Sequence, residues 1–214
     1  MTKNELLRTL ELDDAFAGYV PDKSSILWGW NCEGPVFGEL IREAQPRLII
    51  EVGAWIGLST ATMAKELQRQ GYAESCIITI DTWLGSGEHW LDKEIKESLG
   101  LEFGFPTLYP RFLSNMINAG VTDFMVPLPM TSVIAARYLK VKNISADLIY
   151  IDGSHNEQDV YDDCVAYWDL LAPGGIMFGD DWGWDSVVRA VKRFCNEHAV
   201  NCETNGVHWK LIKN

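Results

Sequence analysis

The sequence predicts an α/β fold, with a doubly wound and mostly parallel sheet that carries helices on both faces. Five short apolar runs recur along the chain, and none of them alternates polar with apolar residues. Strands that are apolar on both faces belong to a parallel sheet buried between two helical layers. Helical patterns fill the stretches between these runs, as the crossovers of a parallel sheet require.

Length and composition fit one domain. The chain has 214 residues, of which 47% are hydrophobic and 22% are charged. A chain of this size buries a large core without a metal or disulfide, and its composition excludes wholesale disorder. No repeat, low-complexity run or linker divides it, so we expect a single domain over residues 1–214.

Charge and cysteines limit the partners. With 18 Lys and Arg against 30 Asp and Glu, the net charge is −12, which repels nucleic-acid phosphates. No run of 18 apolar residues predicts a membrane helix, and Met1 to Glu5 carry no apolar signal segment. Five scattered cysteines without a CxxC pair are typical of reduced thiols. We expect a cytoplasmic protein that binds neither nucleic acid nor membrane, and a homo-oligomer is compatible with the sequence.

The apolar runs are the predicted parallel strands, at 48–50, 77–80, 124–126, 148–151 and 176–178. The third is the weakest, hemmed by Pro127 and Pro129. Near the C-terminus, Asn205-Gly206 separates two strand-like stretches, 199–203 and 207–212, and this dipeptide is a strong hairpin signal. The sheet is therefore expected to end in an antiparallel hairpin.

Helices are expected at 59–70, 131–139 and 157–171, where Pro173-Gly174-Gly175 would end the last of these and turn the chain into the next strand. A further helix, capped by Asp185 or Ser186, would run to about residue 198. Residues 1–46 form a helical prelude that includes 34–43. Residues 84–118 form a long insertion rich in glycine, and such insertions are usually lids or substrate-binding loops.

Acidic residues follow four of the five predicted strands. Ligands of open parallel sheets bind beyond the carboxyl ends of the strands, so these positions mark the candidate site. Packed carboxylates are costly unless a cation or hydrogen-bond donor meets them. The residues concerned are Glu51, Asp81, Asp152, Asp180 and Asp181.

The first strand leads into a tight turn bracketed by Gly53 and Gly57, beyond which a helix N-terminus offers free N–H groups. A dinucleotide fingerprint needs a glycine where Trp55 stands, so NAD is disfavoured. Asp81 is placed to hold the two hydroxyls of a ribose. Its alternative role is to cap a turn.

Several motifs together resemble class I S-adenosylmethionine-dependent methyltransferases, in particular the branch with macrolide-sugar O-methyltransferases and cephalosporin-hydroxylase-like proteins. The resemblance covers about residues 47–213 and departs from the common glycine pattern at Trp55. The motifs are Glu51-Val52-Gly53, Gly57-Leu58-Ser59-Thr60, Ile80-Asp81-Thr82-Trp83-Leu84-Gly85, Tyr150-Ile151-Asp152-Gly153-Ser154-His155, Pro173-Gly174-Gly175 and Gly179-Asp180-Asp181.

The resemblance implies a Rossmann-like sheet with strand order 3-2-1-4-5-7-6 and S-adenosylmethionine as cofactor. Asp81 would hold its ribose, and Trp83 would pack near its adenine. The remaining cofactor residues implied by the resemblance are Glu51, Gly53, Gly57, Ser59, Thr60 and Thr82.

The resemblance also makes the fourth and fifth strands neighbours, which brings Asp152 beside Asp180 and Asp181. Three converging carboxylates suit Mg²⁺ or Mn²⁺, and their alternative role is to order turns. His155, three residues past Asp152, is a candidate general base, as in the sugar O-methyltransferases that it resembles.

The predicted function is a metal-assisted O-methyltransferase of a small hydroxylated molecule, sugar-like or an aromatic diol. Two alternatives stay open at this point. One is a non-catalytic binding or assembly protein that keeps the cofactor fold. The other, a nicotinamide oxidoreductase, is disfavoured by Trp55 and by the absence of a Tyr-x-x-x-Lys motif.

Overall fold

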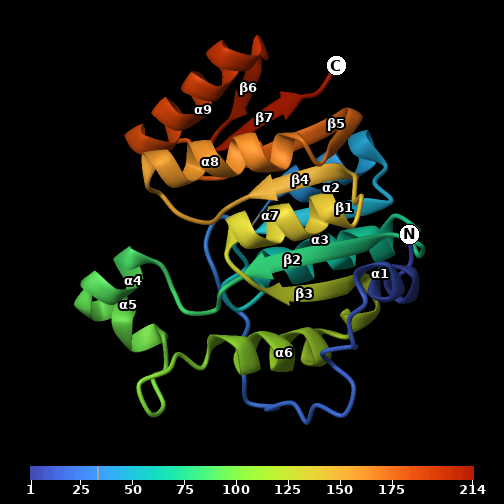
Figure 1. Ribbon diagram of the computed structural model, residues 1–214. Helices are drawn as coiled ribbons and strands as arrows, with labels where there is room; N and C mark the ends of the chain where they lie inside the picture. Colours follow the sequence, from blue (N-terminus) through green and yellow to red (C-terminus); the bar gives the residue numbers. More distant parts are fainter. Residues whose placement is uncertain (33) are drawn as a thin grey trace.

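The computed structural model describes residues 1–32 and 34–214. Its described part contains one seven-stranded sheet of order β3-β2-β1-β4-β5-β7-β6, as the resemblance implied (Figure 1). Strands β1 to β5 pair in parallel, and β7 pairs antiparallel with both β5 and β6. The strands are β1 (Leu48–Val52), β2 (Cys76–Asp81), β3 (Met125–Pro129), β4 (Ala146–Ile151), β5 (Leu171–Gly179), β6 (Cys202–Asn205) and β7 (His208–Ile212).

Helices cover both faces of the sheet, and each face has its own core. One core combines α1, α7, α8 and α9, and the other combines α2, α3 and α6. Figure 1 shows α7 and α8 in front of the sheet, with α2 and α3 behind it. The helices are α1 (Lys3–Leu10), α2 (Val36–Ala44), α3 (Leu58–Arg69), α4 (Gly87–Leu91), α5 (Lys93–Ser98), α6 (Leu108–Ala119), α7 (Ser132–Val141), α8 (Glu157–Trp168) and α9 (Asp185–His198), and Thr122–Phe124 form a short 3₁₀ turn, η1.

The boundary between α8 and β5 differs from the prediction. The helix ends at Trp168, and Leu171 already pairs with Ala146 of β4. The chain therefore enters the sheet before Pro173-Gly174-Gly175, which lies within β5 and does not end the helix. The apolar stripe misled because Leu171 is buried by the strand and not by the helix.

Four smaller expectations also need correction. The two central turn residues of the hairpin are Gly206 and Val207, since Asn205 pairs with His208. Its first strand starts at Cys202, because Ala199 ends α9 in a left-handed conformation. Helix α9 begins after Trp184 with no side-chain cap from Asp185 or Ser186. The prolines Pro127 and Pro129 lie inside β3, where an edge position tolerates the missing N–H donors.

The segments expected as prelude and insertion are each divided. In the prelude, α1 and α2 are helical and the described residues between them are not. In residues 84–118, α4 and α5 contain no buried residues, whereas α6 buries Phe112 and Met116 in the core. Figure 1 shows α4 and α5 beyond the sheet, on the side to which β2, β3 and β4 point. Within the described residues, no helix is long and apolar enough to span a membrane.

Candidate functional site

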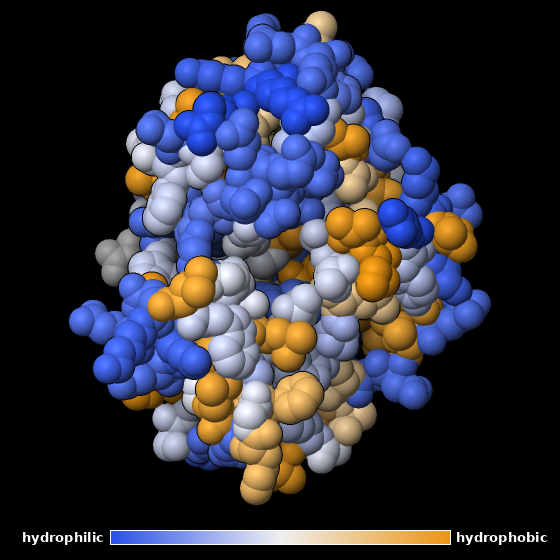
Figure 2. Space-filling view, turned by 60° about the vertical axis from the view of Figure 1, so that its left-hand side comes forward, coloured by the Kyte–Doolittle hydropathy of each residue, from blue (hydrophilic) through white to orange (hydrophobic). Residues whose placement is uncertain are grey.

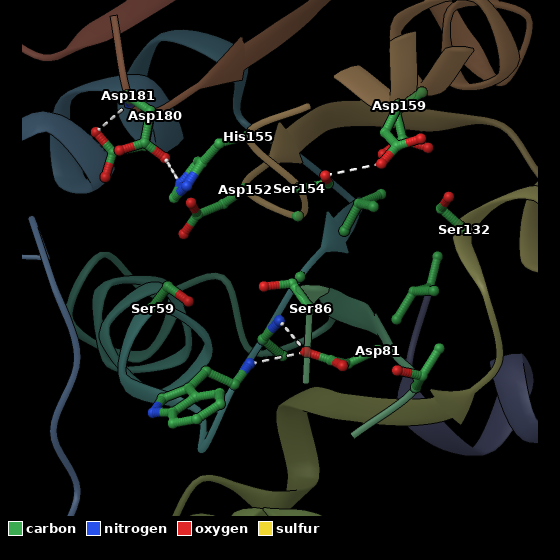
Figure 3. Close-up of a pocket in the computed structure, with 18 of the residues that line it drawn as sticks. Ser59, Asp81, Ser86, Ser132, Asp152, Ser154, His155, Asp159, Asp180 and Asp181 are labelled. Carbon is green, nitrogen blue, oxygen red and sulfur yellow. Dashed lines mark hydrogen bonds and ion pairs between the residues drawn. The ribbon is translucent and has the colours of Figure 1, made fainter. Parts of the chain in front are cut away.

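A cavity of about 610 Å³ lies at the carboxyl ends of the central strands. Figure 2 shows a hollow near the middle of this face, and Figure 3 shows acids from several strands pointing into it. Eight of the predicted site residues line the cavity: Gly53, Ser59, Asp81, Thr82, Asp152, His155, Asp180 and Asp181. The other four, Glu51, Gly57, Thr60 and Trp83, are not among its lining residues.

Glu51 supports the turn after β1 from behind the cavity wall. Its carboxyl group is fully buried and accepts hydrogen bonds from the hydroxyls of Ser59 and Thr60, each at 2.5 Å. Burial raises the pKa of Glu51 to about 7, despite these two donors. The three residues therefore join the end of β1 to the first turn of α3.

The two predicted glycines are required by close approach. A Cβ on Gly53 would lie 1.9 Å from the carbonyl oxygen of Asp152, and a Cβ on Gly57 would lie 2.4 Å from the side chain of Met116. Both also have positive φ, at +88° and +95°. Gly53 thus permits the contact between the ends of β1 and β4, and Gly57 permits the packing of α6 against the turn.

Asp81 orders the same turn through its carboxylate. Its Oδ2 atom accepts hydrogen bonds from the backbone N–H groups of Ala54 and Trp55, both at 2.9 Å. Its Oδ1 atom accepts from the N–H of Trp83 at 2.7 Å. The turn-capping role that the sequence left open is therefore present. The carboxylate still faces the cavity, and Oδ1, which accepts only one of these bonds, keeps a lone pair for a ligand.

Trp83 belongs to the core. Its side chain is 2% exposed, packs against Tyr109 and Phe112, and donates from Nε1 to the carbonyl of Trp55. Trp83 does not line the cavity, and its packing near the adenine stays a prediction. Trp55, with a φ of +50°, lines the cavity instead and stacks on His89 of α4.

The three aspartates predicted to converge do so. One carboxylate oxygen from each of Asp152, Asp180 and Asp181 lies within 4.8 Å of the other two. Asp181 has a φ of +63°, and this bend lets consecutive residues face the same side at the end of β5. Burial and the two neighbouring carboxylates raise the pKa of Asp152 well above its usual range. Such a set of hard oxygen donors, costly to crowd without a cation, fits Mg²⁺ or Mn²⁺.

His155 lies between two carboxylates. Its Nε2 atom is 2.7 Å from Oδ2 of Asp181, and its Nδ1 atom is 2.8 Å from Oε2 of Glu88. The ring stacks on Trp184 with centroids 4.5 Å apart. The hydrogen bond to Asp181, followed by smaller contributions that include the one to Glu88, raises the pKa of His155 to about 9. In this arrangement the imidazole holds a proton at neutral pH and donates on both sides.

Two residues near this centre were missed by the sequence. Glu88 comes from the insertion, where no motif marks it. His208 comes from β7, and its Nε2 atom lies 3.8 Å from Oδ1 of Asp180. The strand order implied by the resemblance placed β7 beside β5, but neither that order nor the hairpin signal carries information about side-chain chemistry.

Comparisons with known proteins agree with this geometry. Residues 50–182 match the model of a family described as a methyltransferase domain. No curated protein is significantly similar to the sequence.

Several solved structures share the fold. The O-methyltransferase from Bacillus cereus, in complex with SAH, is 18% identical over 99% of this chain and 91% of that chain, with a TM-score of 0.58. CalS11, a calicheamicin methyltransferase, is 18% identical over 83% and 77% of the two chains, with a TM-score of 0.61. TomG from Streptomyces achromogenes, an O-methyltransferase in complex with SAM, is 17% identical over 98% and 87%, with a TM-score of 0.56.

Proposed function

The chain belongs to the methyltransferase domain family, and from this premise we propose that it is an S-adenosylmethionine-dependent O-methyltransferase of a small hydroxylated molecule. The observation that carries the proposal is the convergence of Asp152, Asp180 and Asp181 in the cavity that also holds the turn after β1. The similar structures named as O-methyltransferases support oxygen as the acceptor atom.

The cofactor would lie along the turn after β1. Gly53, which lines the cavity, is proposed to face its methionine part beside the N-terminus of α3, and Asp81 is the residue proposed to accept the ribose hydroxyls. S-adenosylmethionine, when bound, supplies an electrophilic methyl group on a sulfonium. The side chains around it hold the reacting atoms in line, which removes much of the entropic barrier. Trp55 in place of a glycine argues against a nicotinamide cofactor.

Asp152, Asp180 and Asp181 are the residues proposed to hold a divalent cation. Mg²⁺ there would supply Lewis acidity toward an acceptor hydroxyl. His155, above these carboxylates, is the proposed base, although it holds a proton in the arrangement described. If the Asp181 carboxylate bound another partner, His155 would lose its hydrogen bond to Asp181. That hydrogen bond is the largest cause of the raised pKa of His155. We further propose that α4 and α5, which contribute residues to the cavity wall, act as a lid.

We also propose that the protein works in a reducing cytoplasm, where its five free cysteines would stay reduced.

Calorimetry with S-adenosylmethionine and S-adenosylhomocysteine tests the cofactor. We expect binding in the micromolar range, about −8 kcal/mol. Methyl transfer to a panel of catechols and sugars, followed by release of S-adenosylhomocysteine, then tests the reaction. Absence of binding by either nucleoside would contradict the proposed function and favour a non-catalytic role.

A further inference from the structure

We infer that the acceptor is a ring-bearing hydroxyl compound that carries a protonated amine, and that phosphorylated or carboxylated acceptors are rejected. This inference rests on the methyl-transfer function proposed above and specifies its substrate class. It follows from the charges and the aromatic surfaces that line the cavity.

The cavity wall is strongly anionic. Along the part of the chain that the structure describes, neither lysine nor arginine lines it, and His89 and His155 are its only basic side chains. A divalent cation on the three converging aspartates would offset two charges and leave the carboxylates of Glu88, Asp159 and Asp162 on the wall. Asp81 is assigned to the ribose, and burial raises the pKa of Asp163 to about 7. The acidic lining residues are Asp81, Glu88, Asp152, Asp159, Asp162, Asp163, Asp180 and Asp181.

An anionic acceptor would meet one protonated side chain in this wall, His155, and both ring nitrogens of His155 are already paired with carboxylates. Proteins usually hold phosphate and carboxylate groups with arginine, lysine or backbone N–H clusters. Here the charged side chain nearest to His155 on the α4 side is Glu88, whose carboxylate lies on the cavity wall. An ammonium group would be attracted where a phosphate would be repelled.

The mouth of the cavity adds an aromatic surface of the kind that binds rings and cations. Trp30 and Trp184 both line it and are 52% and 49% exposed. Trp184 stacks on His155, and Trp30 lies 5.9 Å from Trp55 between ring centroids. Indole faces attract both hydroxylated rings and ammonium groups. The cation and the ring therefore have complementary surfaces at the same opening.

One arginine lies beyond the mouth. Arg189 lines a shallower recess that shares Asn31, Asp181 and Trp184 with the cavity. Its Nε atom is already paired with Glu157 at 2.6 Å, and Asp185 lines the same recess. An anionic extension of the acceptor that left the cavity on this side would meet a charge that is already offset.

Three catechols that share a ring and differ in charge test the inference: dopamine, 4-methylcatechol and 3,4-dihydroxybenzoate. Their dissociation constants are measured by tryptophan fluorescence at pH 7 with Mg²⁺, with and without S-adenosylhomocysteine. We expect dopamine, the cation, to bind at least about tenfold more tightly than 3,4-dihydroxybenzoate, the anion, with neutral 4-methylcatechol between them. The difference between these dissociation constants should become smaller in high salt. Equal or tighter binding of the anion, or binding of none of the three, would overturn the inference.

A pair of variants locates the charge. Glu88→Gln should reduce the ratio of the dissociation constant of 3,4-dihydroxybenzoate to that of dopamine by about two- to fivefold. The reason is that one wall carboxylate is lost without a change in side-chain shape. Glu94→Gln removes an exposed carboxylate of α5 outside the cavity and should leave the ratio unchanged. An unchanged ratio in Glu88→Gln would refute this wall as the amine site. Because the charge order is also measured without the nucleoside, failure of cofactor binding can be told apart from failure of this inference.

Discussion

The Nε2 atom of His155 lies 2.7 Å from the Oδ2 atom of Asp181, across 26 positions of sequence. This contact joins the proposed base to the proposed metal site. It also raises the pKa of the imidazole, so the base can act only after its proton leaves. The contact therefore holds the loop after β4 against the bend after β5.

His155→Ala should lower turnover by about 10²–10⁴ if His155 accepts the proton. Cofactor affinity should change little, because the ring lies beside Asp181 and Trp184 and away from the turn after β1. In the wild type the rate should rise with pH through an apparent pKa between the ordinary value of 6.5 and about 9, and this limb should flatten in the variant. A raised KM with an intact kcat and pH profile would instead assign a positioning role.

Mg²⁺ or Mn²⁺ at millimolar concentration should raise the melting temperature by mass action. Asp152→Asn should abolish this increase, whereas Asp81→Asn, outside the three converging aspartates, should retain it. Because burial and the neighbouring carboxylates raise the pKa of Asp152 well above its usual range, metal binding should release protons and tighten as pH rises. Calorimetry in two buffers of different ionisation enthalpy measures that release. Unchanged melting curves, together with activity that persists in EDTA, would contradict the metal site and leave methyl transfer intact.

Asp81→Ala should weaken binding of S-adenosylhomocysteine by about 1.5–3 kcal/mol through lost hydrogen bonds to a charged group. It should also destabilise the fold, since three backbone N–H groups lose their acceptor. Asp147→Ala is the matched control. Asp147 accepts from the N–H groups of Arg47 and Leu48 at the opposite end of β1, so its loss should reduce stability and spare the cofactor. Equal loss of affinity in both variants would reduce Asp81 to a turn cap.

Glu51 should make the protein less stable as pH rises. Its pKa is about 7 in the folded state against an ordinary 4.5, so the folded state holds a proton that the unfolded state has lost. Between about pH 4.5 and 7 this one group should lower the free energy of unfolding by about 2–3 kcal/mol, with no further change above pH 7. Urea unfolding from pH 4.5 to 8 should show a flatter profile in Glu51→Gln. An exposed control, Glu97→Gln, should keep the wild-type slope.

Gly53→Ala should destabilise the protein by at least about 3 kcal/mol, because the new Cβ would collide with the backbone of Asp152 as well as meet a positive φ. Gly71→Ala separates the two causes. Gly71 has a φ of +84° and open space around its Cα, so it should cost only about 1–2 kcal/mol. Chemical denaturation measures both. Similar losses in the two variants would show that the contact between β1 and β4 is looser than described.

Much of the fold followed from local pattern. Continuous apolar runs predicted the parallel strands, and Asn205-Gly206 predicted the antiparallel end of the sheet. The prediction failed at the boundary between α8 and β5, where an apolar residue fitted both the helical pattern and the strand. Leu171 continued a helical stripe, yet its burial comes from pairing with β4. Sequence periodicity registers that a side chain is buried and not which neighbour buries it.

The sequence by itself determined where the acids stand. A carboxylate that follows a parallel strand must lie at the carboxyl edge of the sheet, so the strand pattern alone assigns Asp81, Asp152 and Asp180 to that edge. Only the tertiary structure decided which residues the side chains of the site contact. The pairing of His155 with Glu88 spans 67 positions, and the burial of Trp83 depends on α6. Such contacts arise when separate elements pack together, and their cost or gain depends on distances that no local pattern encodes.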